Sequence, residues 1–333
     1  MCIISYIPSS ISQVINAYAK VTSIAGTVAN VSNVNEAAHS FEDNEWVILI
    51  QMQDDVIGTT TDVASFGDLG AINSAGSYEI IQISTHTEVA GLPSTVTFHS
   101  TPVNSYNTGA NSSVQIVTYR AYGSPNYTTT SNMTSLPWDG NIGGVISFNV
   151  DGILTLDHDI DADGDGFRGG ATNGGGSTGC TGSSNFRLSS TANFADKGEG
   201  IYKDTDPTYE AGRGRILNGG GGGNSHNAGG AGGGNLTGGG TGGPGWPTCT
   251  PSAGGIGGLN LSADVAANRV FMGGGGGSGE GNNGLATGGA NGGGIVIIKA
   301  IEVTTTTCVN RSITANAESI TAGSGNDGAG GGG

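Results

Sequence analysis

The stretch Arg215-Ile216-Leu217-Asn218 is followed by five glycines, residues 219–223. After an offset of 54 residues, from Arg215 to Arg269, the same order returns as Arg269-Val270-Phe271-Met272 and five glycines, residues 273–277. An arginine, a short apolar run and a glycine run therefore occur twice at a fixed spacing. This regularity indicates an internal repeat rather than low-complexity drift.

Glycine runs usually indicate a flexible linker, because glycine loses more backbone freedom on ordering than any other residue. Large apolar residues that favour burial interrupt these runs and argue against a linker. They are Ile216, Leu217, Trp246, Ile256, Leu259, Val270, Phe271 and residues 295–298. We expect residues 212–294 to be an ordered array of extended, polyproline-II-like segments, with three residues per turn and lateral hydrogen bonds.

The glycine distribution divides the chain into two parts. Of the 65 glycines in 333 residues, only 8 precede residue 140. We expect an all-β chain: residues 1–125 form a small antiparallel barrel or sandwich, and residues 126–333 form β-helix-like rungs with the glycine-rich insertion at about 212–294.

Short strands with few helix signals follow one another in the first part. Residues 13–32 suggest a hairpin, and residues 46–53 form the strongest strand, which should be central. Further strands are expected within residues 77–84, 95–98 and 113–120. The loop from residue 54 to 76 is interpreted either as a binding element or as a flap over the barrel end.

The second part begins with strand, glycine turn and strand over residues 143–162. The same rhythm returns over residues 293–322. Such rungs stack and bury a common core, and they can carry a long insertion that protrudes from one face.

The charge balance excludes some partners. A net charge of −16 and a pI near 4.4 argue against nucleic acid and anionic membranes, which attract basic surfaces. The sequence contains no run of 18 apolar residues, so it predicts no membrane span. The start lacks a convincing signal peptide and the sequence stops within glycines 330–333, so we expect a piece of a longer chain.

The four cysteines have no CxxC spacing, which leaves no basis for a zinc or redox site. Cys180 and Cys249 both lie in glycine-rich loops, where a covalent link stabilises most. We predict that these two are joined, and that Cys2 and Cys308 are not paired with each other.

Several of these segments together carry a resemblance: residues 46–53, 76–79, 143–145, 163–170, 212–227 and 292–298. The chain, over residues 13–333, resembles the glycine-rich N-terminal part of very large secreted cell-surface proteins of the Bacteroidota. These include gliding-motility-type adhesins exported by the type IX secretion route. The resemblance implies an extracellular, cell-surface location and a role in adhesion or filament building. It also implies a longer chain with further regions, and it transfers no catalytic residues.

Asp161, Asp163 and Asp165 match the start of a D-x-D-x-D-G calcium loop, in which carboxylates converge on a hard cation. The match fails at the twelfth position, where a calcium loop has a bidentate Glu and this chain has Thr172. No helices are expected on either side of it. Calcium is therefore weighed against a solvated acidic edge. A weaker candidate is the group Asp204, Asp206 and Glu210.

Catalytic signatures are missing from the sequence. The five histidines have no HxxxH or HExxH spacing, no serine lies in a G-x-S-x-G elbow, and no P-loop lysine follows the glycines. We expect His226 to hydrogen-bond loop backbone. Arg213 and Arg215 either cap carbonyls at the end of the array or bind an acidic sugar. Trp246 is interpreted as a plug among the glycines, with a sugar-stacking platform as the alternative.

Two hypotheses follow from these observations. The first is a non-enzymatic surface adhesin or filament module, in which the array gives rigidity and displays loops. The second is a secreted polysaccharide-active enzyme or carbohydrate-binding module on a β-helix scaffold. The expected partners are a surface polysaccharide or another extracellular ligand, with calcium as the only candidate cofactor.

Overall fold

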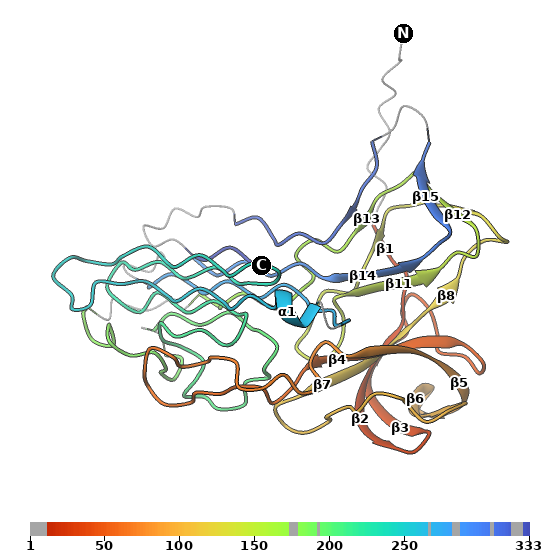
Figure 1. The fold of residues 1–333 in the computed structure, drawn as a ribbon, viewed down its shortest axis with the longest axis horizontal. Coiled ribbons are helices and arrows are strands. Elements are labelled where there is room, and N and C mark those ends of the chain that lie inside the picture. The colour runs from red at the N-terminus through yellow and green to blue at the C-terminus, as the bar shows by residue number, and fades with distance from the viewer. Residues whose placement is uncertain are drawn as a thin grey trace, which may run out of the picture.

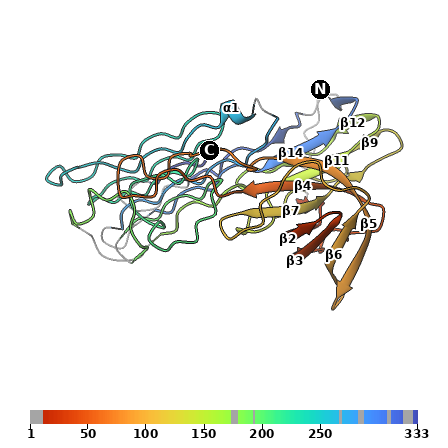
Figure 2. The ribbon, with the colours of Figure 1, turned by 60° about the horizontal axis from the view of Figure 1, so that its bottom comes forward.

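The computed structural model describes residues 12–172, 179–191, 194–265, 268–281, 287–306, 310–320 and 329–333. Across these residues the fold is nearly all-β, and the only helix is the short α1 (Ser262–Val265). Three parts lie together: a closed barrel, a set of parallel sheets, and a bundle of extended glycine-rich segments. The bundle extends to one side, away from the barrel and the sheets (Figure 1). Figure 2 shows the same separation after rotation.

The barrel has six antiparallel strands in the closed order β2-β3-β6-β5-β4-β7. The expected hairpin and the expected central strand are both confirmed, since β2 pairs with β3 and β4 lies between β5 and β7. The strands are β2 (Tyr18–Ala25), β3 (Val28–Asn35), β4 (Trp46–Gln53), β5 (Tyr78–Val89), β6 (Leu92–Phe98) and β7 (Ser113–Thr118).

The first five residues of strand β4, 46–50, form an unbroken apolar run because both faces of the strand are covered. Val47 and Leu49 point into the barrel interior, whereas Ile48 and Ile50 belong to a second cluster outside the barrel. Successive side chains of a strand point to opposite faces, so a strand with two covered faces loses the usual alternation of apolar and polar residues.

The remaining strands form three parallel sheets, in the orders β1-β10-β13-β16, β14-β11-β8 and β15-β12-β9. The chain passes through the three sheets in the same sequence three times, and β1 adds a strand beside β10. The strands are β1 (Gln13–Val14), β8 (Arg120–Ala121), β9 (Tyr127–Thr128), β10 (Met133–Thr134), β11 (Val145–Asn149), β12 (Ile153–Leu156), β13 (Ile160–Asp161), β14 (Ile295–Lys299), β15 (Glu302–Thr305) and β16 (Ile313–Thr314).

The second and third passes through the sheets are direct neighbours although about 150 residues separate them. Val145 pairs with Ile295, and Ile153 pairs with Glu302. Of the strands expected over residues 143–162 and 293–322, those up to residue 315 are therefore present and pair in parallel. Of the one expected at residues 320–322, only Ile320 is described, and it is not in a strand. The first pass, β8 to β10, was not anticipated from the sequence because each of its strands has only two residues.

Backbone hydrogen bonds hold the glycine-rich segments together with a period of three. Along residues 273–280, every amide donates to a neighbouring segment. The amides of residues 273, 276 and 279 donate to residues 293, 290 and 287, those of 274, 277 and 280 to 234, 231 and 228, and those of 275 and 278 to 199 and 196. The first glycine run joins the same network, since Gly220 and Gly223 donate to Gly275 and Ser278.

The segments contact each other without side chains between them. A Cβ built on Gly275 would lie 1.9 Å from the carbonyl oxygen of Arg168, and one on Gly221 would lie 2.2 Å from that of Arg213. Other glycines face open space: a Cβ on Gly240 or Gly243 meets nothing within 4 Å. Only glycine can occupy the interior positions without displacing a neighbouring backbone.

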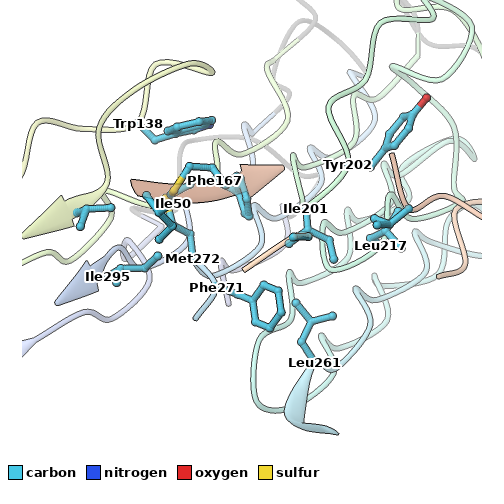
Figure 3. Packing of buried hydrophobic residues seen from close by; sticks show 14 of the residues in the cluster. Ile50, Trp138, Phe167, Ile201, Tyr202, Leu217, Leu261, Phe271, Met272 and Ile295 are labelled. Carbon is cyan, nitrogen blue, oxygen red and sulfur yellow. The ribbon is translucent and has the colours of Figure 1, made fainter. Parts of the chain in front are cut away.

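A shared apolar cluster joins the bundle to the barrel and the sheets. Leu217, Phe271 and Met272 come from the two repeat copies, and they share this cluster with Ile50 of the barrel and Ile295 of the sheets (Figure 3). Each buried side chain of this kind contributes about 1.5–3 kcal/mol, which offsets part of the entropy that the ordered glycines lose.

The long loop over residues 54–76 also packs on the bundle, and the two interpretations of it, as a binding element or as a flap over the barrel end, stay predictions. Phe66 is fully buried in the shared cluster, and the amide of Leu217 donates to the carbonyl of Gly67 at 2.9 Å. Asp68 forms an ion pair with Arg215. The loop therefore fastens the first repeat copy to the barrel.

Candidate functional site

The end of the bundle farthest from the barrel carries several loops tied to one another. A disulfide joins Cys180 to Cys249, with a Cα–Cα distance of 5.0 Å, which confirms that predicted pair. Cys2 and Cys308 lie outside the described residues. We call residues 179–183, 224–227 and 244–252 the tip loops.

Hydrogen bonds add to the disulfide within the tip loops. The amide of Trp246 donates to the carbonyl of His226 at 2.6 Å, and the hydroxyls of Ser183 and Ser225 lie 3.2 Å apart. Glu280, at the end of the second glycine run, accepts a hydrogen bond from the amide of Asn227 at 3.0 Å. Four separate segments, around residues 183, 225–227, 246 and 280, are thereby held in one arrangement.

Trp246 is not a plug. Its side chain is 51% exposed, and its ring meets that of His226 edge to face, with the centroids 6.1 Å apart. The glycine segments pack backbone to backbone and leave no space for an indole, which explains why the tryptophan lies at their end. The bond from Trp246 reaches the backbone carbonyl of His226, so the expected hydrogen bond from the His226 side chain to loop backbone stays a prediction.

A second candidate site is a charged groove of about 490 Å³ where residues 196–204 pass between the bundle and the barrel. Its charged side chains are Arg168, Asp196, Lys197, Glu199, Lys203, Asp204 and Glu210. Of these, the sequence singled out only Asp204 and Glu210, as a weak cation candidate. Isolated charged residues in a glycine-rich segment gave no spacing that could indicate a groove.

Two groups in this groove have pKa values far from their ordinary range. Burial lowers the pKa of Lys197 well below its usual value, because the ammonium is removed from water. Its Nζ donates to the carbonyls of Ala211 and Gly212 and lies 5.3 Å from the centre of the Phe66 ring. Burial likewise raises the pKa of Asp204 to about 6, and the neighbouring Glu210 adds to this rise.

Glu199 has a structural role in the groove. Its carboxylate accepts hydrogen bonds from Gln53 of the barrel, from the indole of Trp138 and from Arg168, with Arg168 Nε at 3.0 Å. Through these bonds Glu199 joins the three parts of the molecule. Both of its carboxylate oxygens already accept hydrogen bonds, so it is unsuited to proton transfer.

Only one of the two arginines has the expected capping contact. Arg215 donates to the carbonyl of Gly257 at 3.3 Å, and it also forms an ion pair with Asp68. The guanidinium of Arg213 lies over the Phe186 ring, and its buried Nε has no hydrogen-bond partner among the described residues. Further carbonyls are capped by Lys197 and by Arg269, which donates to the carbonyls of residues 73 and 75.

The acidic residues before the glycine bundle bond to the next pass of the chain. Asp159 pairs with Arg311 at 3.3 Å, Asp161 accepts from Thr314, and Asp163 accepts from Asn316. Asp165 is buried away from them, where Ser135 donates to it at 2.5 Å. These bonds explain an acidic column on one strand without a cation.

The three predicted calcium ligands therefore have separate hydrogen-bond partners. Within the described residues, no group of three or more His, Cys, Asp or Glu side chains is placed to hold a metal ion. Calcium at Asp161, Asp163 and Asp165 stays a prediction.

Comparison with protein-family models, with curated proteins and with solved structures gives no match to this chain. In the part of the chain that the structure describes, no helix has the length and apolar character needed to cross a membrane.

Proposed function

We propose that the chain is a non-enzymatic, extracellular recognition module of the adhesin type, in which a stiff glycine-rich bundle displays the tip loops. The observation that carries the proposal is Trp246. This large aromatic side chain is half exposed, and a disulfide and backbone hydrogen bonds fix the loops around it. Exposed aromatic residues on a rigid support are typical of binding surfaces, because little entropy is lost when they contact a ligand.

The period-three hydrogen bonding supports the interpretation of the bundle as a polyproline-II-like array. A helix with three residues per turn points successive amides in three directions, so every third amide meets the same neighbour. Residues 273–280 have this pattern, with three neighbouring segments. A bundle linked on three sides resists bending and can hold loops away from the barrel.

The parallel sheets support the second element of the scaffold, a short β-helix of three coils. A glycine bundle inserted between the second and third coils leaves after β13 and returns at β14, where the amide of Gly294 donates to the carbonyl of Ala162 at 2.9 Å. The disulfide supports an oxidising, extracellular environment, because disulfides persist there and are rare in the cytosol.

The test of this function is binding of the purified chain to bacterial cells and to surface polysaccharide. We expect saturable binding that falls at least tenfold in Trp246→Ala. The control is Leu236→Ala, which removes a side chain exposed to 60% in the turn at the barrel end of the bundle. Equal binding by both variants and the unaltered chain would contradict a role for the tip loops.

One observation favours a second candidate, cleavage of a polysaccharide in the charged groove. Asp204, with a pKa of about 6, could hold a proton near neutral pH, as a general acid must. This candidate requires release of reducing sugar ends from a polysaccharide. The release must disappear in Asp204→Asn and persist in Trp246→Ala.

A further inference from the structure

A cavity of about 330 Å³ opens between the outside of the barrel and the sheet β14-β11-β8. It is separate from the tip loops and from the charged groove. The residues lining it are Trp46, Ile80, Tyr119, Ala121, Asn149 and Lys299.

Strand register explains why these residues meet. On the barrel side, Ile80 pairs with Ile48 two residues from Trp46, and the amide of Tyr119 donates to the carbonyl of Trp46 at 2.8 Å. Alternate residues of a strand share a face, so Trp46 and Ile80 lie on the outer face of the barrel.

On the sheet side, Asn149 pairs with Ala121 and with Lys299, at the ends of three neighbouring strands. The cavity therefore has one aromatic and apolar wall from the barrel. Its other wall, from the sheet, carries polar side chains.

Two polar atoms in the walls are unusual. Tyr119 is only 7% exposed, and its buried hydroxyl has no hydrogen-bond partner among the described residues. The buried Oδ1 of Asn149 also lacks a partner there, while its Nδ2 donates to Asp151 at 2.7 Å. Buried polar atoms are nearly always paired in folded proteins, so two unpaired atoms on residues that line one small cavity point to a ligand that pairs them once the two side chains turn toward it.

The apolar wall is unusual because its large side chains are exposed rather than buried. Trp46 is 49% exposed and Ile80 is 41% exposed, although both lie beside a large buried cluster. An exposed aromatic face next to unpaired hydrogen-bonding atoms suits a ligand that has one apolar face and several hydroxyl groups. A ring of six atoms bearing hydroxyls has this combination, and its size fits the lower end of ligand-pocket volumes.

We propose that this cavity binds one pyranose ring of a glycan. The C–H face of the ring lies against the Trp46 indole. A ring hydroxyl donates to Asn149 Oδ1, and another oxygen accepts from the Tyr119 hydroxyl. The exposed ammonium of Lys299 stands at the mouth as a further donor. The site is independent of the tip loops and of any adhesin role.

The experiment uses the full chain with Trp246→Phe, so that fluorescence comes from the half-exposed Trp46 and the buried Trp138 rather than from the tip. The ligands are methyl glycosides of glucose, galactose, mannose, N-acetylglucosamine and glucuronic acid, titrated to 50 mM. We expect at least one to bind with a millimolar Kd, as is usual for a ligand of about twelve heavy atoms. A preference for the glucuronoside that is lost in Lys299→Met would show that the site takes an acidic ring. Equal affinities for the glucuronoside and the neutral glycosides would show that it takes a neutral ring.

Tyr119→Phe is the decisive variant, because it removes a hydroxyl that has no hydrogen-bond partner among the described residues. We expect Tm to stay the same or rise while affinity falls about 5- to 10-fold, the usual effect of one hydrogen bond. Trp46→Ala removes the fluorescent reporter, so its binding is followed by ligand-observed NMR, where we expect none. Val103→Ala, a change at an exposed barrel loop, should leave binding intact. Failure of every glycoside to bind would overturn the proposal. So would unchanged affinity in Tyr119→Phe, or loss of the signal in Val103→Ala.

Discussion

Replacing Gly275 by alanine tests whether the glycine bundle is an ordered array. A Cβ at this position would lie 1.9 Å from the carbonyl oxygen and 2.5 Å from the carbonyl carbon of Arg168. Relief of that overlap requires the two segments to separate by more than 1 Å, by the usual limit of about 3.4 Å for such contacts. The same carbonyl of Arg168 accepts a hydrogen bond from the amide of Glu199 at 2.9 Å.

The magnitude follows from the hydrogen bonds that this separation breaks. Gly275 donates to Glu199 at 2.9 Å, and Gly170 donates to Gly276 at 2.8 Å. Each buried group left unpaired costs about 1–3 kcal/mol, so we expect about 2–5 kcal/mol from the two bonds. That is a large fraction of the 5–15 kcal/mol typical of a folded protein. Gly221→Ala, with its Cβ 2.2 Å from the Arg213 oxygen, should cost a similar amount.

The assay is thermal unfolding followed by circular dichroism, with Gly243→Ala as the matched control. Nothing lies within 4 Å of a Cβ at Gly243, and its φ is not in the left-handed region, so the added methyl group should leave Tm unchanged or slightly higher. Gly275→Ala should lower Tm by about 5–10 °C, at about 2 °C per kcal/mol for a chain of this size. A neutral Gly275→Ala, or equal effects at all three positions, would refute the ordered array.

Three further predictions concern charge and covalent links. Loss of the disulfide in Cys180→Ser with Cys249→Ser should reduce the free energy of unfolding by about 2–4 kcal/mol, since the bond closes a loop over a separation of 69 residues. Denaturant titration should show that the double variant no longer responds to reductant, and an unchanged midpoint would argue against the link. Because the pKa of Asp204 is raised to about 6 from 3.8, its ionised form disfavours the folded state, and the free energy of unfolding falls as pH rises through 6. Asp204→Asn should therefore be about 1–2 kcal/mol more stable at pH 7.5, after discounting for partial exposure, and no more stable near pH 4; a stabilisation that does not depend on pH would contradict this cause. A calcium ion at Asp161, Asp163 and Asp165 requires that a chelator lower Tm and that Asp163→Asn remove the difference; identical melting curves would leave hydrogen bonding as the role of these carboxylates.

The barrel strands could be predicted because local patterns decide them. Residues 46–50 are an unbroken apolar run, and Gly26-Thr27 marks the hairpin between β2 and β3. The two-residue strands β8, β9 and β10 could not be found in this way, because two residues have no periodicity. Only their pairing with β11, β12 and β13 defines them.

The candidate sites were predicted less completely than the strands. The disulfide could be inferred from two cysteines in glycine-rich loops, since a link there has few competing partners. The environment of Lys197 could not, because its burial depends on Phe66, which is 131 residues earlier in the chain. Trp246 was misplaced because a large side chain among glycines suggests a filled space, whereas the glycine segments exclude side chains altogether.

The close backbone contacts in the bundle also constrain how this sequence can change over generations. Every missense mutation of a glycine codon introduces a residue with a Cβ, and at positions such as Gly233 or Gly276 that atom would fall about 2.0 Å from a neighbouring carbonyl oxygen. Interior positions therefore have no acceptable alternative amino acid, and selection should hold them fixed. The loops between the segments have no such restriction. A lineage under pressure to recognise new surfaces could diversify its tip loops rapidly while the glycines behind them stay the same.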